Sequence, residues 1–338
     1  MLTLPTEESL GASLPPERLP LLITGATGVP GYNALAYFRE RYGDQVVGQR
    51  PRVSWRMRGP GVEPADLENP ADVRDLFARY GFRSVLSCGG SCALKSCELD
   101  PAMAHRVNVM AVDNLVREIG QRDVRLVHLS IDLVFSGQRP GDYVETDPTD
   151  PVTVYGATMV AGERIVIEQR PDACILRISL PMGESFNGHA GAIDWIQSRF
   201  RKGFPATLYF DEVRTPSYVQ CMNVLYEYLL ASPLTGLYHA GGPRKLTLFE
   251  IAQIVNRIGG YDARLLHGCP RIEAGNIPPR AGNVTLNSDK LSAALGFRPF
   301  LQWPRSDLLV PDHRQWHFER PSGLDYGPEL LARILYQR

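Results

Sequence analysis

The sequence predicts an α/β fold in which a doubly wound parallel sheet, covered by helices on both faces, is followed by a small C-terminal lobe. Short apolar runs alternate with longer segments of helical periodicity through the first half of the chain. This order is typical of parallel strands that are joined by crossover helices. From residue 181 to residue 216 the pattern changes to sequence rich in Gly, Phe and polar residues, which indicates a ligand-facing lobe at the carboxyl edge of the sheet.

Each expected strand is a short buried run, and each expected helix has apolar residues on one face. The expected strands cover residues 19–24, 45–48, 84–88, 125–130, 172–178 and 236–240. The expected helices cover residues 32–41, 70–80, 101–120, 152–169, 247–259 and 288–296. Thr247 is expected to cap its helix, because Glu250 three residues later completes a capping box.

Composition and charge exclude several classes of protein. The 338 residues carry a formal net charge of -1 and 44% of them are hydrophobic, so we expect no nucleic-acid or membrane partner. No apolar run reaches the length of about 18 residues that spans a bilayer, and the first twenty residues combine acidic residues with four prolines, which is unlike a secretory signal. We expect a cytoplasmic protein with a small-molecule ligand and a flexible tail over residues 1–18.

Six cysteines in a chain of this length indicate free thiols in a reducing compartment rather than a disulfide framework. Cys88, Cys92 and Cys97 are close in sequence, but their spacing is not that of paired zinc ligands. We expect no metal site and no catalytic role for these thiols, because no nearby base or cation is evident in the sequence.

A glycine-rich turn joins the first expected strand to the first expected helix. The run TGATGVPG ends at Gly31 and has the spacing G-x-x-G-x-x-G. Glycine lets the main chain approach a phosphate, and amides at a helix N-terminus favour negative charge. Pro30 is tolerated in the first helical turn, where its missing N–H has no intrahelical partner. The sequence therefore predicts that a dinucleotide binds at Gly25, Thr27, Gly28, Val29, Pro30 and Gly31.

The end of the second expected strand bears on which dinucleotide binds. A carboxylate there accepts from a free ribose hydroxyl, whereas an arginine accommodates a 2′-phosphate. The run GQRPR, which contains Arg50 and Arg52, holds no acid. We therefore expect NADP(H) in preference to NAD(H), with Arg50 at the phosphate. The alternative, that both arginines are solvated loop charges, stays open.

Further segments match a known family in order along the chain. They are the Asp66-Leu67 pair, VNVMAVDNL around Asn108, LSIDLVFSG from Leu129, DPTDPVTVYGATMVAGE from Asp147, RTPSYV from Arg214, YHAGGPRKLTLFEIA from Tyr238 and NSDKLSAALGF from Asn287. From Leu21 to about Pro299 the chain resembles the extended short-chain dehydrogenases/reductases. It is most similar to the dTDP-4-dehydrorhamnose reductase family and its relative, the regulatory beta subunit of methionine adenosyltransferase.

The resemblance implies a domain organisation and a set of site residues. It implies a Rossmann domain over residues 19–180, a substrate-binding lobe over 181–310 from which 236–260 returns to the sheet, and a C-terminal extension over 311–338. Asp66 and Leu67 should contact the adenine, and Tyr155 should lie beside the nicotinamide. The other implied cofactor contacts are Cys88, Gly89, Gly90 and Asn108, and the implied substrate contacts are Ser130, Asp132, Arg214 and Arg280.

Two active-site positions depart from the family pattern. Its working members hold a Ser or Thr, a Tyr and, four residues after the Tyr, a Lys, whereas this chain has Ile131, Tyr155 and Met159. A thioether cannot lower the pKa of a phenol as an ammonium does, and an isoleucine cannot donate to a carbonyl. Ser130 should point to the face opposite Ile131, and Thr158 should bond its own backbone. A structural hydrogen bond is therefore favoured over a substitute role for either hydroxyl.

The predicted function is NADP(H)-dependent reduction of a keto group on a nucleotide-sugar-like or specialised metabolite, with Tyr155 as the proton donor. Two alternatives stay open. One is a non-catalytic, dinucleotide-binding regulatory subunit, which Ile131 and Met159 favour. The other is a redox-neutral enzyme with the same fold. Analogy with the family suggests a homodimer or a larger enzyme partner.

Overall fold

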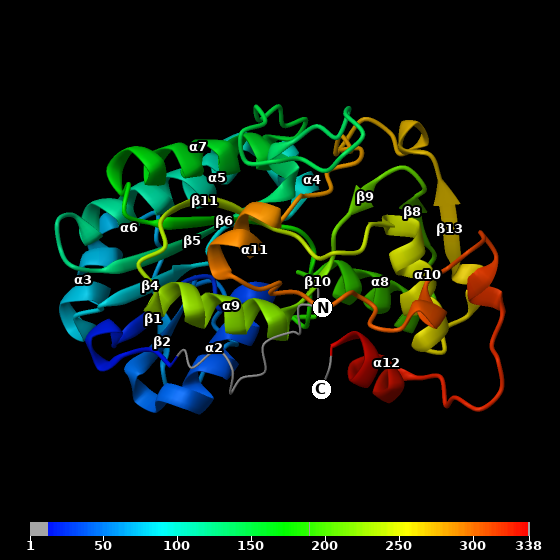
Figure 1. Cartoon of the computed structure of the whole chain (residues 1–338), viewed down its shortest axis with the longest axis horizontal. Helices are drawn as coiled ribbons and strands as arrows, with labels where there is room; N and C mark the ends of the chain where they lie inside the picture. Colours follow the sequence, from blue (N-terminus) through cyan, green and yellow to red (C-terminus); the bar gives the residue numbers. More distant parts are fainter. Residues whose placement is uncertain (1–12, 189, 337–338) are drawn as a thin grey trace.

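The structure is a computed structural model that describes residues 13–188 and 190–336. Its main body is a parallel sheet of seven strands in the order β11-β6-β5-β4-β1-β2-β3 (Figure 1). These strands are β1 (Leu21–Ile23), β2 (Val46–Arg50), β3 (Val62–Pro64), β4 (Ser84–Ser87), β5 (Arg125–Ile131), β6 (Cys174–Ile178) and β11 (Gly236–Ala240). The doubly wound α/β fold that the sequence predicts is confirmed.

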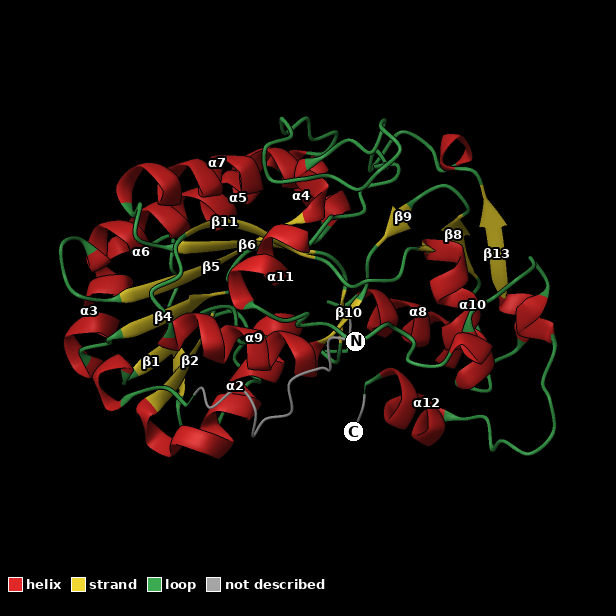
Figure 2. Ribbon diagram, viewed as in Figure 1, coloured by secondary structure: helices red, strands yellow, loops and turns green. Residues whose placement is uncertain are grey.

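Helices cover both faces of this sheet (Figure 2). One face is covered by α2 (Val29–Tyr42), α9 (Val219–Ala231) and α11 (Asp289–Leu295), whose apolar residues share one core cluster with β1 and β6. The other face is covered by α3 (Pro70–Tyr80), α6 (Ala111–Ile119) and α7 (Val154–Gln169). Within the two described ranges, no helix is both long and apolar enough to cross a membrane.

A smaller lobe is built mainly from the chain that follows β6. Its helices are α8 (Ala192–Arg201), α10 (Leu248–Ile258) and α12 (Pro328–Leu335), and its short strands are β7 (Pro181–Met182), β8 (Ala206–Tyr209), β9 (Val213–Arg214), β10 (Ser217–Tyr218), β12 (Leu246–Thr247) and β13 (Leu266–Cys269). The capping box expected at Thr247 is present, because its hydroxyl accepts from Glu250 N–H at 3.1 Å and its own N–H donates to the Glu250 carboxylate at 2.7 Å.

The structure differs from the expected elements in both the main body and the smaller lobe. The single helix expected over residues 101–120 is divided into α5 (Pro101–His105), a π-helical turn (Arg106–Met110) and α6, preceded by the short helix α4 (Leu94–Leu99). β3 is not among the expected strands, because this edge strand has only three half-buried residues. Also absent from the expected elements are α8, α9, α12 and the short strands of the smaller lobe. Apolar residues lie on most sides of α9, which is buried between the sheet and other helices, so its sequence shows little helical periodicity.

The tail expected over residues 1–18 lies mostly outside the described residues. In the part that is described, Leu14 is buried and its N–H donates to Tyr42 Oη at 2.7 Å. Pro16–Arg18 form a 3-10 turn. Leu14 is therefore packed on the main body, whereas Pro16 and Glu17 are exposed.

Candidate nucleotide-binding and active site

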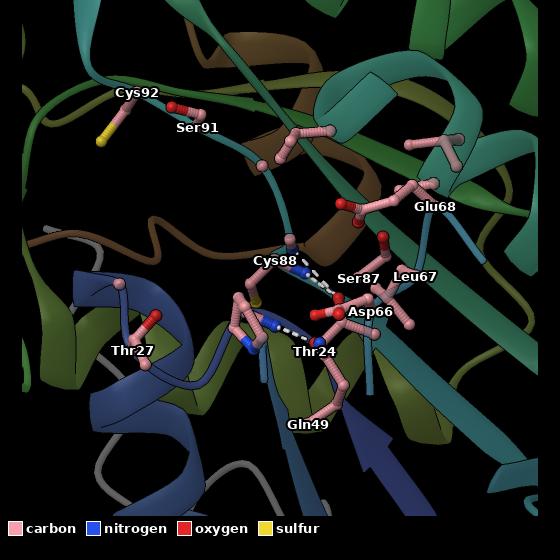
Figure 3. Close-up of a pocket in the computed structure, with 18 of the residues that line it drawn as sticks. Thr24, Thr27, Gln49, Asp66, Leu67, Glu68, Ser87, Cys88, Ser91 and Cys92 are labelled. Atoms are coloured by element: carbon pink, nitrogen blue, oxygen red, sulfur yellow. Dashed lines mark hydrogen bonds between the residues drawn. The ribbon is translucent and has the colours of Figure 1, made fainter. Parts of the chain in front are cut away.

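A cleft of about 370 Å³ opens at the carboxyl ends of β1, β2 and β4 (Figure 3), which is the edge where open α/β sheets bind ligands. Most of the predicted cofactor contacts line it, namely Gly25, Thr27, Gly28, Asp66, Leu67, Cys88, Gly89 and Gly90. Figure 3 places Asp66 and Leu67 at one end of the cleft and Cys92 at the other. The predicted contacts that do not line the cleft are Val29, Pro30, Gly31, Arg50, Asn108 and Tyr155.

The three glycines of the turn have different physical roles. Gly25 has a φ of +64°, and a Cβ built on it would lie 2.6 Å from Cys88 O. A Cβ on Gly31 would lie 2.4 Å from Gly25 O. These two positions therefore exclude larger residues for steric reasons within the protein. Among the described residues other than its chain neighbours, a Cβ on Gly28 would meet only Gly25 O, at 3.6 Å, so Gly28 faces open space in the cleft.

Two polar side chains that the sequence analysis did not single out hold the turn in place. Thr24 Oγ1 accepts hydrogen bonds from Cys88 N–H at 3.1 Å and Gly89 N–H at 3.0 Å. Gln49 Oε1 accepts from Gly25 N–H at 2.9 Å, while its Nε2 donates to Ala65 O at 2.6 Å. The available signal was a polar residue at the end of a buried strand. It could not be interpreted without knowing which strands are neighbours.

The cleft has the features that a dinucleotide needs. Gly28 is the N-cap of α2, a helix of 14 residues, so free amides and the positive end of the helix dipole lie at the floor of the cleft, next to open space. Val29 and Pro30 occupy the first turn of that helix. At the end of the cleft away from Cys92, the carboxylate of Asp66 lies beside the apolar side chain of Leu67 (Figure 3). A carboxylate can accept from the exocyclic amine of an adenine, and an apolar side chain can pack on its ring. The residues present therefore fit a dinucleotide.

The structure turns Arg50 away from the cleft. Its guanidinium donates to Met57 O at 2.7 Å and to Pro51 O at 3.0 Å, so it shapes the loop that follows β2. This geometry does not place Arg50 at a 2′-phosphate, because loop carbonyls already accept hydrogen bonds from its Nε and Nη1. Arg52 follows the cleft residue Pro51 directly, and its side chain is 56% exposed and paired with Asp72 at 2.8 Å. Among the described residues, no Lys or Arg lines the cleft itself.

Tyr155 lies near the Cys92 end of the cleft, within the protein. It is 6% exposed, and Met159 one helical turn later is 7% exposed in the same apolar cluster. Burial raises the pKa of Tyr155 well above 10, and Cys92 and Asp132 add to this effect, whereas Arg214 opposes it. The phenol is therefore held in its protonated form.

Buried ion pairs join the predicted substrate contacts. Asp132 accepts from Arg214 Nη1 at 2.6 Å and from the Ser179 hydroxyl at 2.6 Å. Arg214 Nη2 donates to Glu212 at 2.8 Å, and Glu212 in turn pairs with Arg280 at 2.8 Å. The structure thus brings Asp132, Arg214 and Arg280 together through Glu212, which the sequence analysis missed. Asp132 comes from the main body and the other three from the smaller lobe, so these pairs also fix the two parts against each other.

Ser130 and Asn108 have partners inside the protein. Ser130 is 2% exposed and its hydroxyl donates to the buried carboxylate of Glu163, so it has no open path to a substrate and we do not retain it as a contact. Asn108 Oδ1 accepts from Ser91 N–H at 2.7 Å, and its Nδ2 donates to Thr158 Oγ1 at 2.9 Å. Asn108 therefore holds the cleft loop on α7. Thr158 Oγ1 donates to Tyr155 O at 2.8 Å, which confirms the backbone bond expected of this residue.

The cysteines show no activated thiol. Burial raises the pKa of Cys88 and of Cys92, so both are protonated at neutral pH and are weak nucleophiles. All six cysteines are free. In the part of the chain that the structure describes, no group of three or more His, Cys, Asp or Glu side chains could hold a metal ion.

Comparisons with known proteins extend over most of the chain. The model of the RmlD substrate binding domain family matches residues 19–306. A probable low-salt glycan biosynthesis reductase, Agl14 of Haloferax volcanii, is 26% identical over 276 residues, which are 81% of this chain and 91% of that protein. Methionine adenosyltransferase 2 subunit beta of Xenopus tropicalis is 28% identical over 244 residues, covering 68% of this chain and 69% of the relative. A crystal structure of dTDP-4-dehydrorhamnose reductase from Bacillus anthracis in complex with NADP superposes with a TM-score of 0.69 at 21% identity, covering 84% of this chain and 95% of that chain.

Proposed function

Since the chain belongs to the RmlD substrate binding domain family, which confirms the resemblance inferred from its motifs, we propose that it is a reductase that uses a nicotinamide dinucleotide. NADP(H) is the preferred cofactor in this proposal and NAD(H) the alternative. The substrate class is a keto group on a nucleotide-sugar-like or specialised metabolite. The observation that carries the proposal is the cleft at the carboxyl edge of the sheet, with open space beside Gly28 and helix amides at its floor. Agl14, whose name describes a reductase, and the NADP-bound reductase structure support it.

In this proposal the glycine turn holds the diphosphate and Asp66 and Leu67 bind the adenine. When bound, the dinucleotide supplies a hydride. The 2′-phosphate of NADP(H) is assigned to Arg52 instead of Arg50. Arg52 follows the cleft residue Pro51, and its backbone N–H donates to Asp66 at 2.8 Å. Its guanidinium is exposed and can exchange its pairing with Asp72 for a phosphate.

Tyr155 donates the proton to the carbonyl oxygen. A reduction needs the phenol in its protonated form, and burial holds the pKa of Tyr155 well above 10. Oxidation of an alcohol needs the phenolate, which a lysine ordinarily stabilises and Met159 cannot. The replacements at residues 131 and 159 therefore leave a site suited to the reducing direction. Of the proposed substrate contacts, Arg280, with 16% of its side chain exposed, is the one able to meet a phosphate. Asp132 and Arg214 are buried, so in this proposal they act by holding Glu212 and Arg280 in position.

The test is carbonyl-dependent oxidation of NADPH by the purified protein, followed at 340 nm across a panel of nucleotide-linked keto sugars. We expect at least one substrate to consume NADPH, and a Tyr155→Phe variant to lose that activity while it still binds the cofactor. Binding of NADPH without turnover of any keto sugar would contradict the reductase assignment.

A second function has one observation in its favour. The chain has Ile131 and Met159 where working members of the family have a Ser or Thr and a Lys. It is also similar to methionine adenosyltransferase 2 subunit beta. A non-catalytic regulatory subunit would keep the dinucleotide cleft and lose the catalytic groups. In that case a larger enzyme should co-purify with the chain. The Tyr155→Phe variant should then retain full biological activity.

A further inference from the structure

The segment between β7 and α8 lies across the glycine turn. We call residues 183–188, 190 and 191 the crossing segment, and the structure describes all of these residues. Phe186 N–H donates to Thr27 O at 3.2 Å, and Asn33 Nδ2 from α2 donates to Glu184 O at 2.8 Å. Further along, Asn187 and Ala190 line the cleft. A dinucleotide seated on the glycine turn would therefore lie beneath this segment.

A buried carboxylate from the smaller lobe holds the crossing segment in this position. Asp194, in the first turn of α8, accepts from Ser185 N–H at 2.8 Å and from the Ser185 hydroxyl at 2.6 Å. Ser185 Oγ also accepts from Ala190 N–H at 3.1 Å, so a single side chain ties both ends of the segment to Asp194. Asp194 and Ser185 are each 5% exposed. Hydrogen bonds to a carboxylate are stronger than those between neutral groups, and more so when water is excluded.

Resting on the proposed function, we propose that Asp194 is a positioning residue for the dinucleotide. Through Ser185 it keeps the crossing segment closed over the diphosphate, and the cofactor leaves only when these bonds break. Asp194 contacts neither the reacting atoms nor the glycine turn, so it acts through the segment that it holds. Because α8 belongs to the lobe to which substrate binding is assigned, the same contact makes the residence time of the cofactor depend on that lobe.

The first test is the rate at which NADPH dissociates. Four proteins are loaded with NADPH and mixed with excess NADP⁺ in a stopped-flow fluorimeter. They are wild type, Asp194→Ala, Ser185→Ala and Ser198→Ala, which is a matched control on the same helix. We expect dissociation about tenfold faster in Asp194→Ala, equivalent to about 1.4 kcal/mol. Ser185→Ala should be about threefold faster, because the backbone bond from residue 185 to Asp194 remains. Association rates should change less than dissociation rates, and the control should match wild type.

The second test needs no cofactor. Amide hydrogen exchange is measured by mass spectrometry on the same four proteins, and we expect faster exchange of the crossing segment in Asp194→Ala while α2 and β1 exchange as in wild type. If Asp194→Ala does not fold, Ser185→Ala, which keeps the carboxylate, decides alone. If wild type binds NADPH and the folded variants release it at the wild-type rate, this inference is overturned and the proposed function stays intact. A wild type that binds no dinucleotide would instead refute the proposed function.

Discussion

Substitution of Gly28 by alanine separates cofactor binding from folding. Apart from its two chain neighbours, the only described residue within 4 Å of a Cβ at residue 28 is Gly25, whose O lies at 3.6 Å, which is an ordinary contact. Gly28 has a φ of -80°, so alanine adopts this backbone without strain. The added methyl group enters the space in the cleft where the diphosphate is proposed to lie.

The expected effects follow from this geometry. Alanine is a poorer N-cap than glycine, but it also restricts the unfolded chain, and the two effects oppose each other. We expect the free energy of unfolding to change by less than about 1 kcal/mol. NADPH affinity should fall at least about tenfold, because a methyl group excludes the close approach of phosphate to the helix amides.

Gly31→Ala is the matched control. A Cβ there would lie 2.4 Å from Gly25 O, so the turn must move, and we expect a loss of about 1–3 kcal/mol in folding stability. Urea denaturation and fluorescence titration of NADPH measure both quantities for each variant. A Gly28→Ala protein that is stable and binds NADPH as tightly as wild type would refute the proposed position of the diphosphate.

Three further predictions concern single side chains. Tyr155→Phe should lower turnover of a keto substrate by about 100-fold or more in steady-state assays with cofactor affinity unchanged, and wild-type turnover would exclude Tyr155 as the proton donor. Thr24→Val leaves the Cys88 and Gly89 amides without their acceptor, and we expect urea denaturation to report a loss of about 1–3 kcal/mol; an unchanged midpoint would mean that water replaces the hydroxyl. Burial lowers the pKa of His128 from 6.5 to about 4, so on acidification the imidazole is protonated in the unfolded chain before it is protonated in the folded one. About 3 kcal/mol of the stability present at pH 7 should therefore be lost as the pH falls from 6.5 to 4. His128→Gln should remove that part of the pH dependence in denaturation curves, and an identical pH profile would show that other groups cause it.

The main body could be predicted from the sequence because its signals are local. Apolar runs mark the buried strands, and within the TGATGVPG turn Gly31 has a local steric reason, because a Cβ there would meet Gly25 O. The capping box at Thr247 is likewise complete within four residues. These features depend on neighbours in the chain, so an isolated sequence contains them.

The features that the sequence did not predict depend on contacts between residues that belong to different elements or loops. Arg50 has the residue type expected for a 2′-phosphate, yet its direction is set by the carbonyl of Met57 in the following loop. Gln49 becomes important only because β2 lies beside β1, so that its amide reaches Gly25 N–H. Asp194 is an ordinary acidic residue of a helical first turn until the fold brings Ser185 to it. In each case the side chain is visible in the sequence and its partner is not.

Native mass spectrometry of the folded, full-length protein, with and without NADPH or NADH, tests the central claim most directly. We predict a mass increase of one dinucleotide per chain, retained at lower concentrations of NADPH than of NADH. If well-folded protein takes up neither nucleotide at millimolar concentration, the assignment of the cleft to a dinucleotide is wrong.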